Sequence, residues 1–254
     1  MSTFANNIEC LEPGIINNCT GFEAWFTLKN ASQLNRNEEI PGLNLGFNTK
    51  SGRNQVLANR DLLFTTLDID PDWVALADQV HGTRVVQVTT GGVYPEIDGL
   101  ITAVPGLALG IQVADCAAVL LADPVAQIAG AVHAGWRGAA GNILGNALEM
   151  FEDAGSDPSE LAAWISPCIC RDHFEVGEEV AEQFPDEFVD RVHFDKPHVN
   201  LKAYLFHQLR SGGVLEKNIE ASTGCTIGDA DSYYSHRREN GRTGRMMGII
   251  RISG

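Results

Sequence analysis

The sequence predicts an α+β (mixed α/β) fold in which packed mixed β-sheets are flanked by helices. Short, almost continuously apolar runs fill the middle of the chain between Asp-Gly, Pro-Gly and Asp-Pro turns, which is typical of strands in a sheet covered on both faces. Helical patterns accompany these runs without the regular strand and helix alternation of a parallel α/β protein. The chain of 254 residues suffices for one sizeable core, so we expect a single domain over residues 1–254.

Each element is predicted from its own local pattern. Residues 30–53 are rich in Asn, Gly and Ser and predict a long loop. Asn54 is a suitable N-cap, and the apolar stripe after it predicts a helix that ends before Asp70-Pro71. The expected strands cover residues 73–77, 83–88, 100–102, 108–113, 117–121, 128–132, 219–222 and 246–252. The other expected helices cover residues 139–154, 177–184 and 201–209, and Gly155 is well placed to end the first of them.

Charge and hydropathy argue against several classes of protein. The chain has 18 basic and 33 acidic side chains, for a net charge of −15. That excess disfavours sequence-independent nucleic-acid binding and attachment to anionic membranes. The most apolar stretch, residues 107–122, is interrupted by Gln112 and Asp115, and the N-terminal residues lack the pattern of a signal peptide. We therefore expect a cytoplasmic protein with reduced cysteines and neither nucleic acid nor membrane as a partner.

Three residues with metal-ligand chemistry lie at or near the ends of apolar runs: His81, Cys116 and His133. A turn at Asp123-Pro124 would fold the last two onto the same end of a hairpin. Two imidazoles and a thiolate suit zinc, and three protein ligands leave a fourth position for water or substrate. From spacing alone, half-buried histidines and a small core cysteine are the more common explanation. A third possibility uses Cys116 as a nucleophile and His133 as its base, without metal.

Arginines gather near the C-terminus. Residues 235–245 contain Arg237, Arg238, Arg242 and Arg245, four of the 18 basic residues of an acidic chain. One guanidinium group can bind two phosphate oxygens at once, so the cluster indicates a site for an anion. The alternative is a solvated hairpin with internal ion pairs, in which Glu239 is one partner.

Taken together, several motifs resemble the YfiH family, also called the laccase-domain or multicopper polyphenol oxidase family. They occur in the family's order and cover nearly the whole chain. The matching stretches are Leu43-Asn44-Leu45-Gly46, Asn59-Arg60, Gln79-Val80-His81-Gly82-Thr83-Arg84-Val85, Asp98-Gly99-Leu100-Ile101-Thr102, Ala114-Asp115-Cys116, Ala131-Val132-His133-Ala134-Gly135-Trp136-Arg137-Gly138, and residues 235–245.

This resemblance implies a function for the chain. His81, Cys116 and His133 fall on the family's zinc ligands, with copper as a possible substitute. Family members act as purine nucleoside phosphorylases on adenosine, inosine and methylthioadenosine, and as adenosine deaminases. The older assignment is copper-dependent oxidation of phenols, as in a laccase. The implied partners are purine nucleosides and phosphate, bound by a monomer or homodimer.

The resemblance also carries four substrate-binding candidates onto this sequence, namely Asn44, Arg60, Gln79 and Arg237. Asp115 is the candidate catalytic carboxylate that shuttles a proton during deamination, provided that the preceding strand has ended. Otherwise neighbouring side chains would point to opposite faces.

Two features weigh on the choice among these functions. The family usually carries an Arg-x-Gly-Gly-Val-Ser stretch before the Leu-Asn-Leu-Gly motif, whereas residues 28–32 of this chain read Leu-Lys-Asn-Ala-Ser. Loss of that arginine would alter activity or substrate preference. The sequence also contains no His-x-His pair, which multicopper oxidation requires. The same cysteine and histidines also suit a Cys-His hydrolase or a metal-binding module without catalysis.

Overall fold

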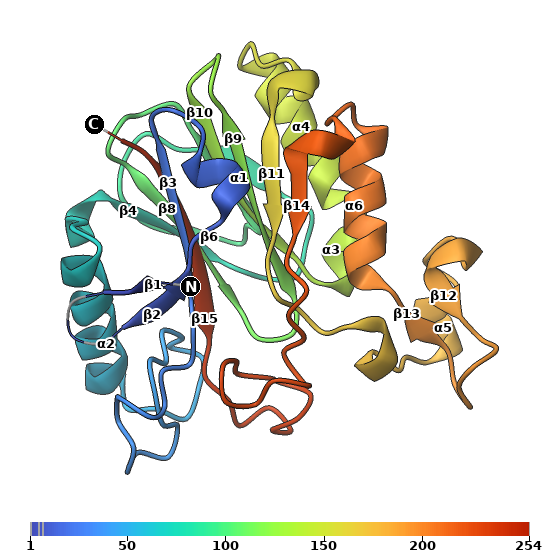
Figure 1. Ribbon diagram of the computed structural model, residues 1–254, viewed down its shortest axis with the longest axis horizontal. Helices are drawn as coiled ribbons and strands as arrows, with labels where there is room; N and C mark the ends of the chain where they lie inside the picture. The colour runs from blue at the N-terminus through green and yellow to red at the C-terminus, as the bar shows by residue number, and fades with distance from the viewer. Residues whose placement is uncertain (1, 5, 7, 254) are drawn as a thin grey trace.

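Two β-sheets pack face to face, and helices cover their outer faces, in the computed structural model (Figure 1). It describes residues 2–4, 6 and 8–253. The first sheet has the strand order β1-β2-β3-β15-β8-β4-β6. Its strands are β1 (Ser2–Thr3), β2 (Glu9–Leu11), β3 (Phe22–Thr27), β15 (Met246–Ile252), β8 (Ala108–Val113), β4 (Val74–Asp78) and β6 (Gly92–Pro95). This architecture confirms the predicted fold class.

The second sheet has the strand order β14-β11-β9-β10-β7-β5. Its strands are β14 (Ile219–Ala221), β11 (Ala162–Ile165), β9 (Ala117–Asp123), β10 (Ile128–Ala134), β7 (Gly99–Thr102) and β5 (Val85–Gln87). A small antiparallel pair is formed by β12 (Val189–Asp190) and β13 (His198–Val199).

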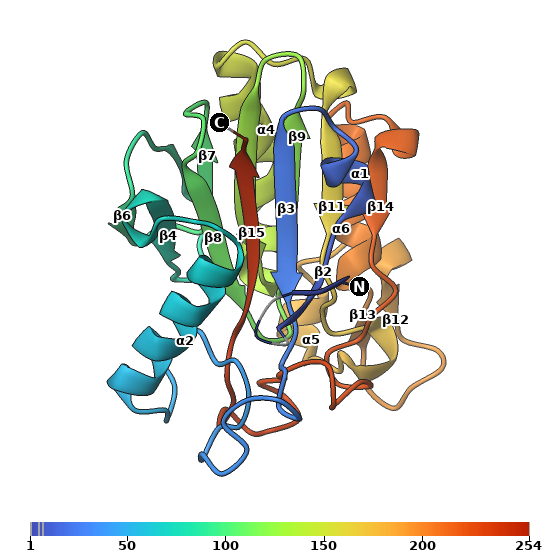
Figure 2. The same ribbon diagram turned by 60° about the vertical axis from the view of Figure 1, so that its left-hand side comes forward.

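Helices lie on both outer faces (Figure 2). The α-helices are α1 (Gly14–Asn17), α2 (Arg53–Thr66), α3 (Trp136–Ala140), α4 (Ile143–Asp153), α5 (Glu178–Ala181) and α6 (Leu201–Ser211). Helix α2 covers the first sheet, and α4 and α6 cover the second. Short 3₁₀ turns cover Pro71–Trp73, Pro158–Glu160, Arg171–His173, Asp186–Phe188 and Glu216–Asn218. None of the described helices combines the length and the apolar character needed to cross a membrane.

Strand β9 shows why its sequence is continuously apolar. Leu120 points into the core between the two sheets, where Phe26 and Trp164 pack with their ring centroids 5.7 Å apart. Its neighbours Val119 and Leu121 point to the opposite face and pack under α4 and α6. Because side chains alternate along a strand, a strand buried on both faces must be apolar at every position.

The structure confirms the predicted hairpin and adjusts other elements. Strands β9 and β10 pair as an antiparallel hairpin in which His133 lies opposite Ala118. The helix predicted over residues 139–154 is instead divided into α3 and α4 by Asn142, which adopts a left-handed φ of 63°. Asn adopts this conformation more readily than most residues with a Cβ, and the amide oxygen of Asn142 accepts a hydrogen bond from Gln208 at 3.3 Å. The helix predicted over residues 177–184 is shortened to α5, and strands β3 and β11 were not predicted.

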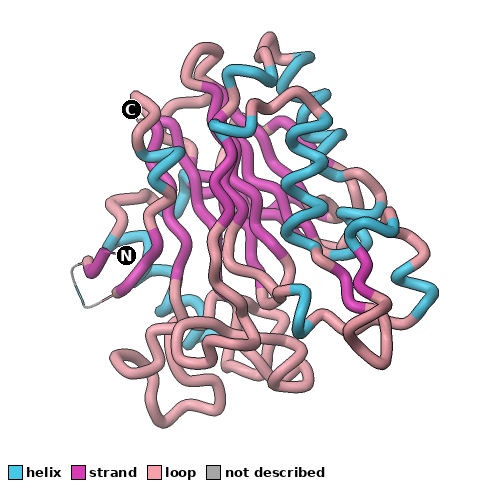
Figure 3. The backbone as a smooth tube through the Cα atoms, turned by 45° about the vertical axis from the view of Figure 1, so that its right-hand side comes forward, coloured by secondary structure: helices cyan, strands magenta, loops and turns pink. Residues whose placement is uncertain are grey.

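Two long irregular segments meet at one end of the sheets (Figure 3). One follows β3 and contains the predicted loop of residues 30–53, and the other connects β14 to β15. Backbone bonds join them, from Lys29 to Ser232 and from Leu45 to Arg245. This end of the molecule holds the residues that the sequence singled out.

Candidate metal and substrate site

Three different elements bring His81, Cys116 and His133 together, and we call these residues the central triad. His81 follows β4, Cys116 lies in the turn between β8 and β9, and His133 lies near the end of β10. Their ligand atoms all lie within 4.8 Å of one another, a spacing compatible with a bound metal ion. Among the described residues, no fourth metal-ligand side chain joins this group. The donor set therefore leaves a coordination position open, as in catalytic metal sites.

Asp98 orients the central triad, and the sequence analysis did not identify it as a site residue. Its Oδ1 lies 2.7 Å from Nδ1 of His133, and both side chains are buried. Since Nδ1 is taken by the carboxylate, Nε2 is the nitrogen left to bind a metal. A carboxylate that holds the second nitrogen of a histidine ligand fixes its tautomer and raises its basicity. In the sequence, Asp98 could have been recognised as a site residue from its position in an Asp-Gly motif directly before β7.

The same carboxylate shapes the turn that carries His81. It accepts hydrogen bonds from the backbone N–H groups of His81 and Gly82, at 2.9 and 2.6 Å. His81 has a φ of 61° and Asp115 a φ of 84°, which are uncommon for residues with a Cβ. Strained backbone of this kind concentrates at functional sites, where surrounding contacts maintain it.

Cys116 and His133 form a thiolate and imidazolium pair in the absence of metal. Burial acts to raise the pKa of the Cys116 thiol, but the charge and hydrogen bonds of His133 and His81 outweigh it and lower the pKa to about 6. Burial likewise acts to lower the pKa of His133, but the Cys116 thiolate and Asp98 raise it to about 9. Each partner thus favours the charged form of the other.

Gly135 leaves space beside the central triad. A Cβ at this position would lie 2.8 Å from Sγ of Cys116 and 3.2 Å from Cδ2 of His81. Its backbone, with φ −78° and ψ 174°, is open to any residue, so the requirement for glycine is steric.

The central triad opens into a cavity of about 690 Å³. Aromatic side chains of Phe47, Trp136 and Phe174 line it together with four arginines, which are Arg60, Arg137, Arg237 and Arg245. Within the described residues, none of these arginines lies within 4.0 Å of a carboxylate. Asp78 and Asp115 also line the cavity, so its arginines outnumber its carboxylates in a chain of net charge −15.

Arg60 is a buried member of this group. Its Nε and Nη2 donate to the carbonyl of Leu45 at 2.9 and 2.7 Å, and its guanidinium lies over the ring of Phe47. Burial and the nearby charge of Arg53 lower the pKa of Arg60 to about 10, so it stays charged at neutral pH. A fixed, charged guanidinium is suited to an anionic substrate group.

Gln79 and Asn44 have different positions. Gln79 lines the cavity, but its amide donates to and accepts from the backbone of Gln112, at 2.8 Å each. Asn44 is fully buried and does not line the cavity. Its amide donates to Thr49 and accepts from the backbone of Arg245. Asn44 therefore joins the two long segments, and its assignment to substrate binding stays a prediction.

Asp115 lines the cavity beside Cys116 because β8 ends at Val113, which removes the alternation of a strand. Its carboxylate accepts from the hydroxyl of Thr226 at 2.6 Å and from the backbone of Arg237 at 2.7 Å. These bonds hold the arginine segment in place, and the assignment of Asp115 as a proton carrier stays a prediction.

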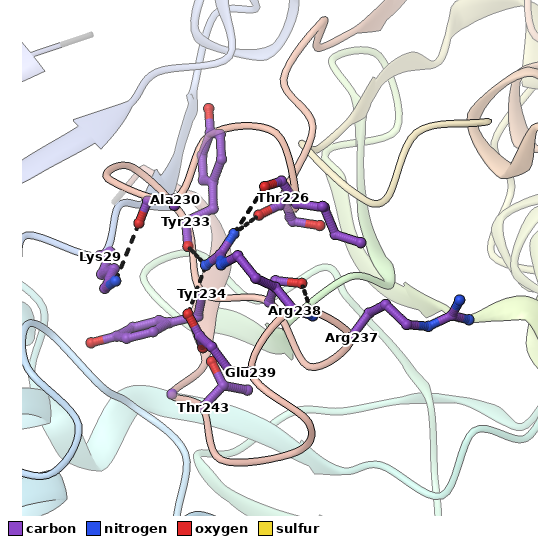
Figure 4. Close-up of polar contacts among 12 residues, drawn as sticks. Lys29, Thr226, Ala230, Tyr233, Tyr234, Arg237, Arg238, Glu239 and Thr243 are labelled. Carbon is purple, nitrogen blue, oxygen red and sulfur yellow. Dashed lines mark hydrogen bonds and ion pairs between the residues drawn. The ribbon is translucent and has the colours of Figure 1, made fainter. Parts of the chain in front are cut away.

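Two arginines of the segment 235–245 have different surroundings (Figure 4). Arg238 donates to the carbonyls of Thr226 and Tyr233 and pairs with Glu239, as expected for a hairpin with internal ion pairs. Arg237 extends away from that cluster, is exposed and lines the cavity, with Nη1 2.9 Å from the carbonyl of Glu175. The hairpin interpretation holds for Arg238, and anion binding by Arg237 stays a prediction.

The segment that departs from the family pattern ties loops together. Lys29 donates to the carbonyl of Ala230 and lies over the ring of Tyr234 (Figure 4). It does not line the cavity. The four cavity arginines come from other parts of the chain.

Comparisons with known proteins identify the family of the chain and its relatives. Residues 24–253 match the family described as multi-copper polyphenol oxidoreductase laccase. The chain is 39% identical to a purine nucleoside phosphorylase of Deinococcus radiodurans over 217 residues, which are 82% of this chain and 81% of the relative. It is 30% identical to an adenosine deaminase of an unknown prokaryotic organism over 249 residues, covering 91% of this chain and 94% of that one.

Solved structures show the same fold. YlmD of Geobacillus stearothermophilus matches with a TM-score of 0.90 at 27% identity, covering all of both chains. A YfiH protein of Bacillus licheniformis matches with a TM-score of 0.87 at 29% identity, covering 94% of this chain and 95% of that one. The family match extends over nearly the whole chain, and the chain therefore belongs to the multi-copper polyphenol oxidoreductase laccase family, whose members include the YfiH-type proteins.

Proposed function

We propose that the protein is a zinc-dependent purine nucleoside enzyme that performs phosphorolysis and adenosine deamination. The observation that carries this proposal is the joining, in one cavity, of the central triad with four arginines that have no carboxylate partner among the described residues. Similarity to proteins named purine nucleoside phosphorylase and adenosine deaminase supports the substrate class. Two imidazoles and a thiolate fit zinc, which supplies Lewis-acid polarisation of an oxygen on substrate or water.

For phosphorolysis, the protein must hold phosphate beside the ribose of the nucleoside. A phosphate oxygen attacks C1′, the bond from C1′ to the purine nitrogen breaks, and the purine leaves with a proton. We assign phosphate binding to Arg60 and Arg237, which both line the cavity and whose guanidinium groups can pair with phosphate oxygens. Gln79 is proposed to position the substrate from the same wall, with its amide held by β8.

For deamination, water replaces the amine at C6 of adenine and ammonia leaves. A proton must then move from the water to the leaving amine, and Asp115 is the proposed carrier. The rings of Phe47, Trp136 and Phe174 offer apolar surface against which a purine can stack.

Product analysis tests the proposal directly. Zinc-loaded protein is incubated with adenosine, inosine or methylthioadenosine, with and without phosphate. We expect free base and ribose 1-phosphate from adenosine and inosine only when phosphate is present. Inosine and ammonia should form from adenosine in either case. Unchanged adenosine at full zinc occupancy would falsify the proposal.

A variant separates the two reactions. Arg60→Gln should raise the KM for phosphate by about 10-fold to 100-fold, since a hydrogen bond to a charged group contributes about 1.5–3 kcal/mol. Deamination should change much less because it uses no phosphate. Arg210→Gln is the matched control, because Arg210 lies on the surface of α6 and pairs with Glu216.

The geometry also favours a second candidate, a metal-free Cys-His hydrolase. Asp98, His133 and Cys116 form a chain of carboxylate, imidazole and thiolate, in which Asp98 is the orienting group that such an enzyme needs. Chelation separates the two candidates. A hydrolase keeps its activity after zinc is removed and loses it on alkylation of Cys116, whereas the zinc enzyme loses activity in both treatments.

Copper-dependent phenol oxidation is a third candidate, and the description of the family favours it. Copper binds such ligands more tightly than zinc, so added copper can enter a zinc site. Metal analysis of protein purified without added metal, beside a phenol oxidation assay, distinguishes the two. Zinc content with no phenol oxidation supports the nucleoside enzyme, and copper content with oxidation contradicts it.

A further inference from the structure

A second group of cysteine and histidine side chains lies outside the cavity, formed by Cys170, His173 and Cys225, which we call the surface triad. Their ligand atoms all lie within 4.8 Å of one another. Sγ of Cys170 lies 3.2 Å from Nδ1 of His173, and the same nitrogen lies 3.4 Å from Sγ of Cys225. Cys170 directly precedes the 3₁₀ turn Arg171–His173, His173 ends that turn, and Cys225 lies in the segment between β14 and β15.

These separations fit a shared metal ion. In a tetrahedral zinc site, zinc to sulfur is about 2.3 Å and zinc to nitrogen about 2.0–2.1 Å, which places sulfur and nitrogen about 3.6 Å apart. Small movements of the side chains would bring the observed 3.2 and 3.4 Å to that value. We propose that Cys170, His173 and Cys225 bind a zinc ion, as a second site that is independent of the central triad.

The backbone near the surface triad supplies a hydrogen-bond donor to one of its two sulfur atoms. The N–H of Cys170 donates to Sγ of Cys225 at 3.4 Å. The N–H of His173 donates to the carbonyl of Cys170 at 3.1 Å, and this bond closes the turn that carries both side chains. Bonds from backbone N–H groups stabilise the negative charge that a thiolate brings to a metal.

The exposure of these residues allows a metal to enter. His173 is exposed, and both cysteines are half-buried. Cys168 lies close in sequence but is fully buried in the core beneath α6, so we do not include it among the ligands. A solvent molecule would complete the coordination from the open side.

A metal bound by the surface triad would fix residues that form part of the cavity wall. Ile169 and Phe174 lie on either side of the Cys170–His173 turn, and both line the cavity. The guanidinium of Arg237 lies 5.8 Å from the centre of the Phe174 ring. Zinc would therefore join the turn to the segment that carries Arg237, and its binding free energy would add to the stability of the folded chain.

Metal titration of a Cys116→Ser protein tests the second site without the central one. Reduced, metal-free protein is titrated with Zn²⁺ for stoichiometry and with Co²⁺ for thiolate-to-cobalt charge-transfer absorption. We expect two zinc ions per wild-type chain, one in Cys116→Ser, and none in Cys116→Ser/Cys225→Ser. If Cys116→Ser does not fold, His81→Ala serves as the background, since His81 is exposed.

The matched control is Cys19→Ser, which removes another half-buried cysteine and should leave two zinc ions bound. Cys170→Ser and Cys225→Ser should each remove one zinc ion and abolish the zinc-dependent rise in Tm that remains in the Cys116→Ser background. A fully reduced and folded Cys116→Ser or His81→Ala chain that binds no zinc overturns the proposal, as does bound zinc that Cys225→Ser does not remove. The same holds if the two thiols close to a disulfide in air but bind no zinc after reduction.

Discussion

The central and surface triads offer a metal the same kinds of donor in different surroundings. In the central triad, His133 is buried on a strand and bonded to Asp98, and the ligands face a cavity lined by arginines. In the surface triad, Nδ1 of the exposed His173 has no hydrogen-bond partner other than the two sulfur atoms among the described residues, and the ligands lie on a turn and a loop. Similar donors thus serve different purposes, because the surrounding groups decide which ligands are oriented and what else can bind.

The largest expected effect comes from Cys116→Ser. Loss of a residue that only orients a ligand lowers metal affinity or activity by about 10-fold to 100-fold. Loss of a ligand itself should therefore lower activity by more than about 100-fold. Steady-state phosphorolysis of adenosine measures this. Cys225→Ser should cost less than about 10-fold, because it acts only through the cavity wall. Equal losses in the two variants would show that both triads belong to one catalytic unit.

Asp98→Asn should have the next largest effect. The substitution keeps the shape of the side chain but places an amide opposite His133 and the N–H groups of the His81 turn. We expect a fall of about 10-fold to 100-fold in zinc affinity and activity. Zinc binding at the surface triad should be unchanged, which stoichiometric titration at two zinc concentrations would reveal. Full activity in Asp98→Asn would show that the central triad does not need the Asp98 carboxylate to orient His133.

Gly135→Ala tests whether the central triad needs the free space that Gly135 leaves beside it. The added Cβ would lie 2.8 Å from the Cys116 sulfur, so the thiolate or the backbone must shift. We expect zinc affinity to fall by about 10-fold, and the free energy of unfolding to fall by about 1–3 kcal/mol because of overpacking. Gly52→Ala is the control, since nothing lies within 4 Å of a Cβ there. Equal behaviour of the two variants would contradict the steric role.

The smallest expected effect is on proton release. The pKa of Cys116 is about 6 and that of His133 about 9, so at pH 8 the metal-free pair is thiolate and imidazolium. A metal needs a neutral imidazole, so zinc binding should release about one proton and tighten as the pH rises toward 9. Calorimetry of the Cys225→Ser protein in buffers of different ionisation enthalpy measures this. Zinc binding without proton release at pH 8 would refute the ion pair.

The sequence predicted much of the second sheet because its strands carry strong local patterns. The turn at Asp123-Pro124 indicated the hairpin, and the hairpin placed Cys116 and His133 at one end. Strand β3 escaped prediction although it lies in the middle of the first sheet, where it pairs with β15 from the far end of the chain. Its short mixed pattern becomes a strand through that long-range pairing, which no local window contains.

The sequence by itself identified His81, Cys116 and His133 as candidate metal ligands, and it predicted the long loop before α2 and showed the arginine cluster. Only the tertiary structure decided that Asp98 supports His133, that Arg60 joins Arg237 in one cavity, and that Cys170 meets Cys225 across 55 positions. Motifs record which residues a site needs, whereas contacts between distant segments depend on strand register and loop packing. Strand register and loop packing are set when both sheets are buried together, so they can be read only from the folded chain.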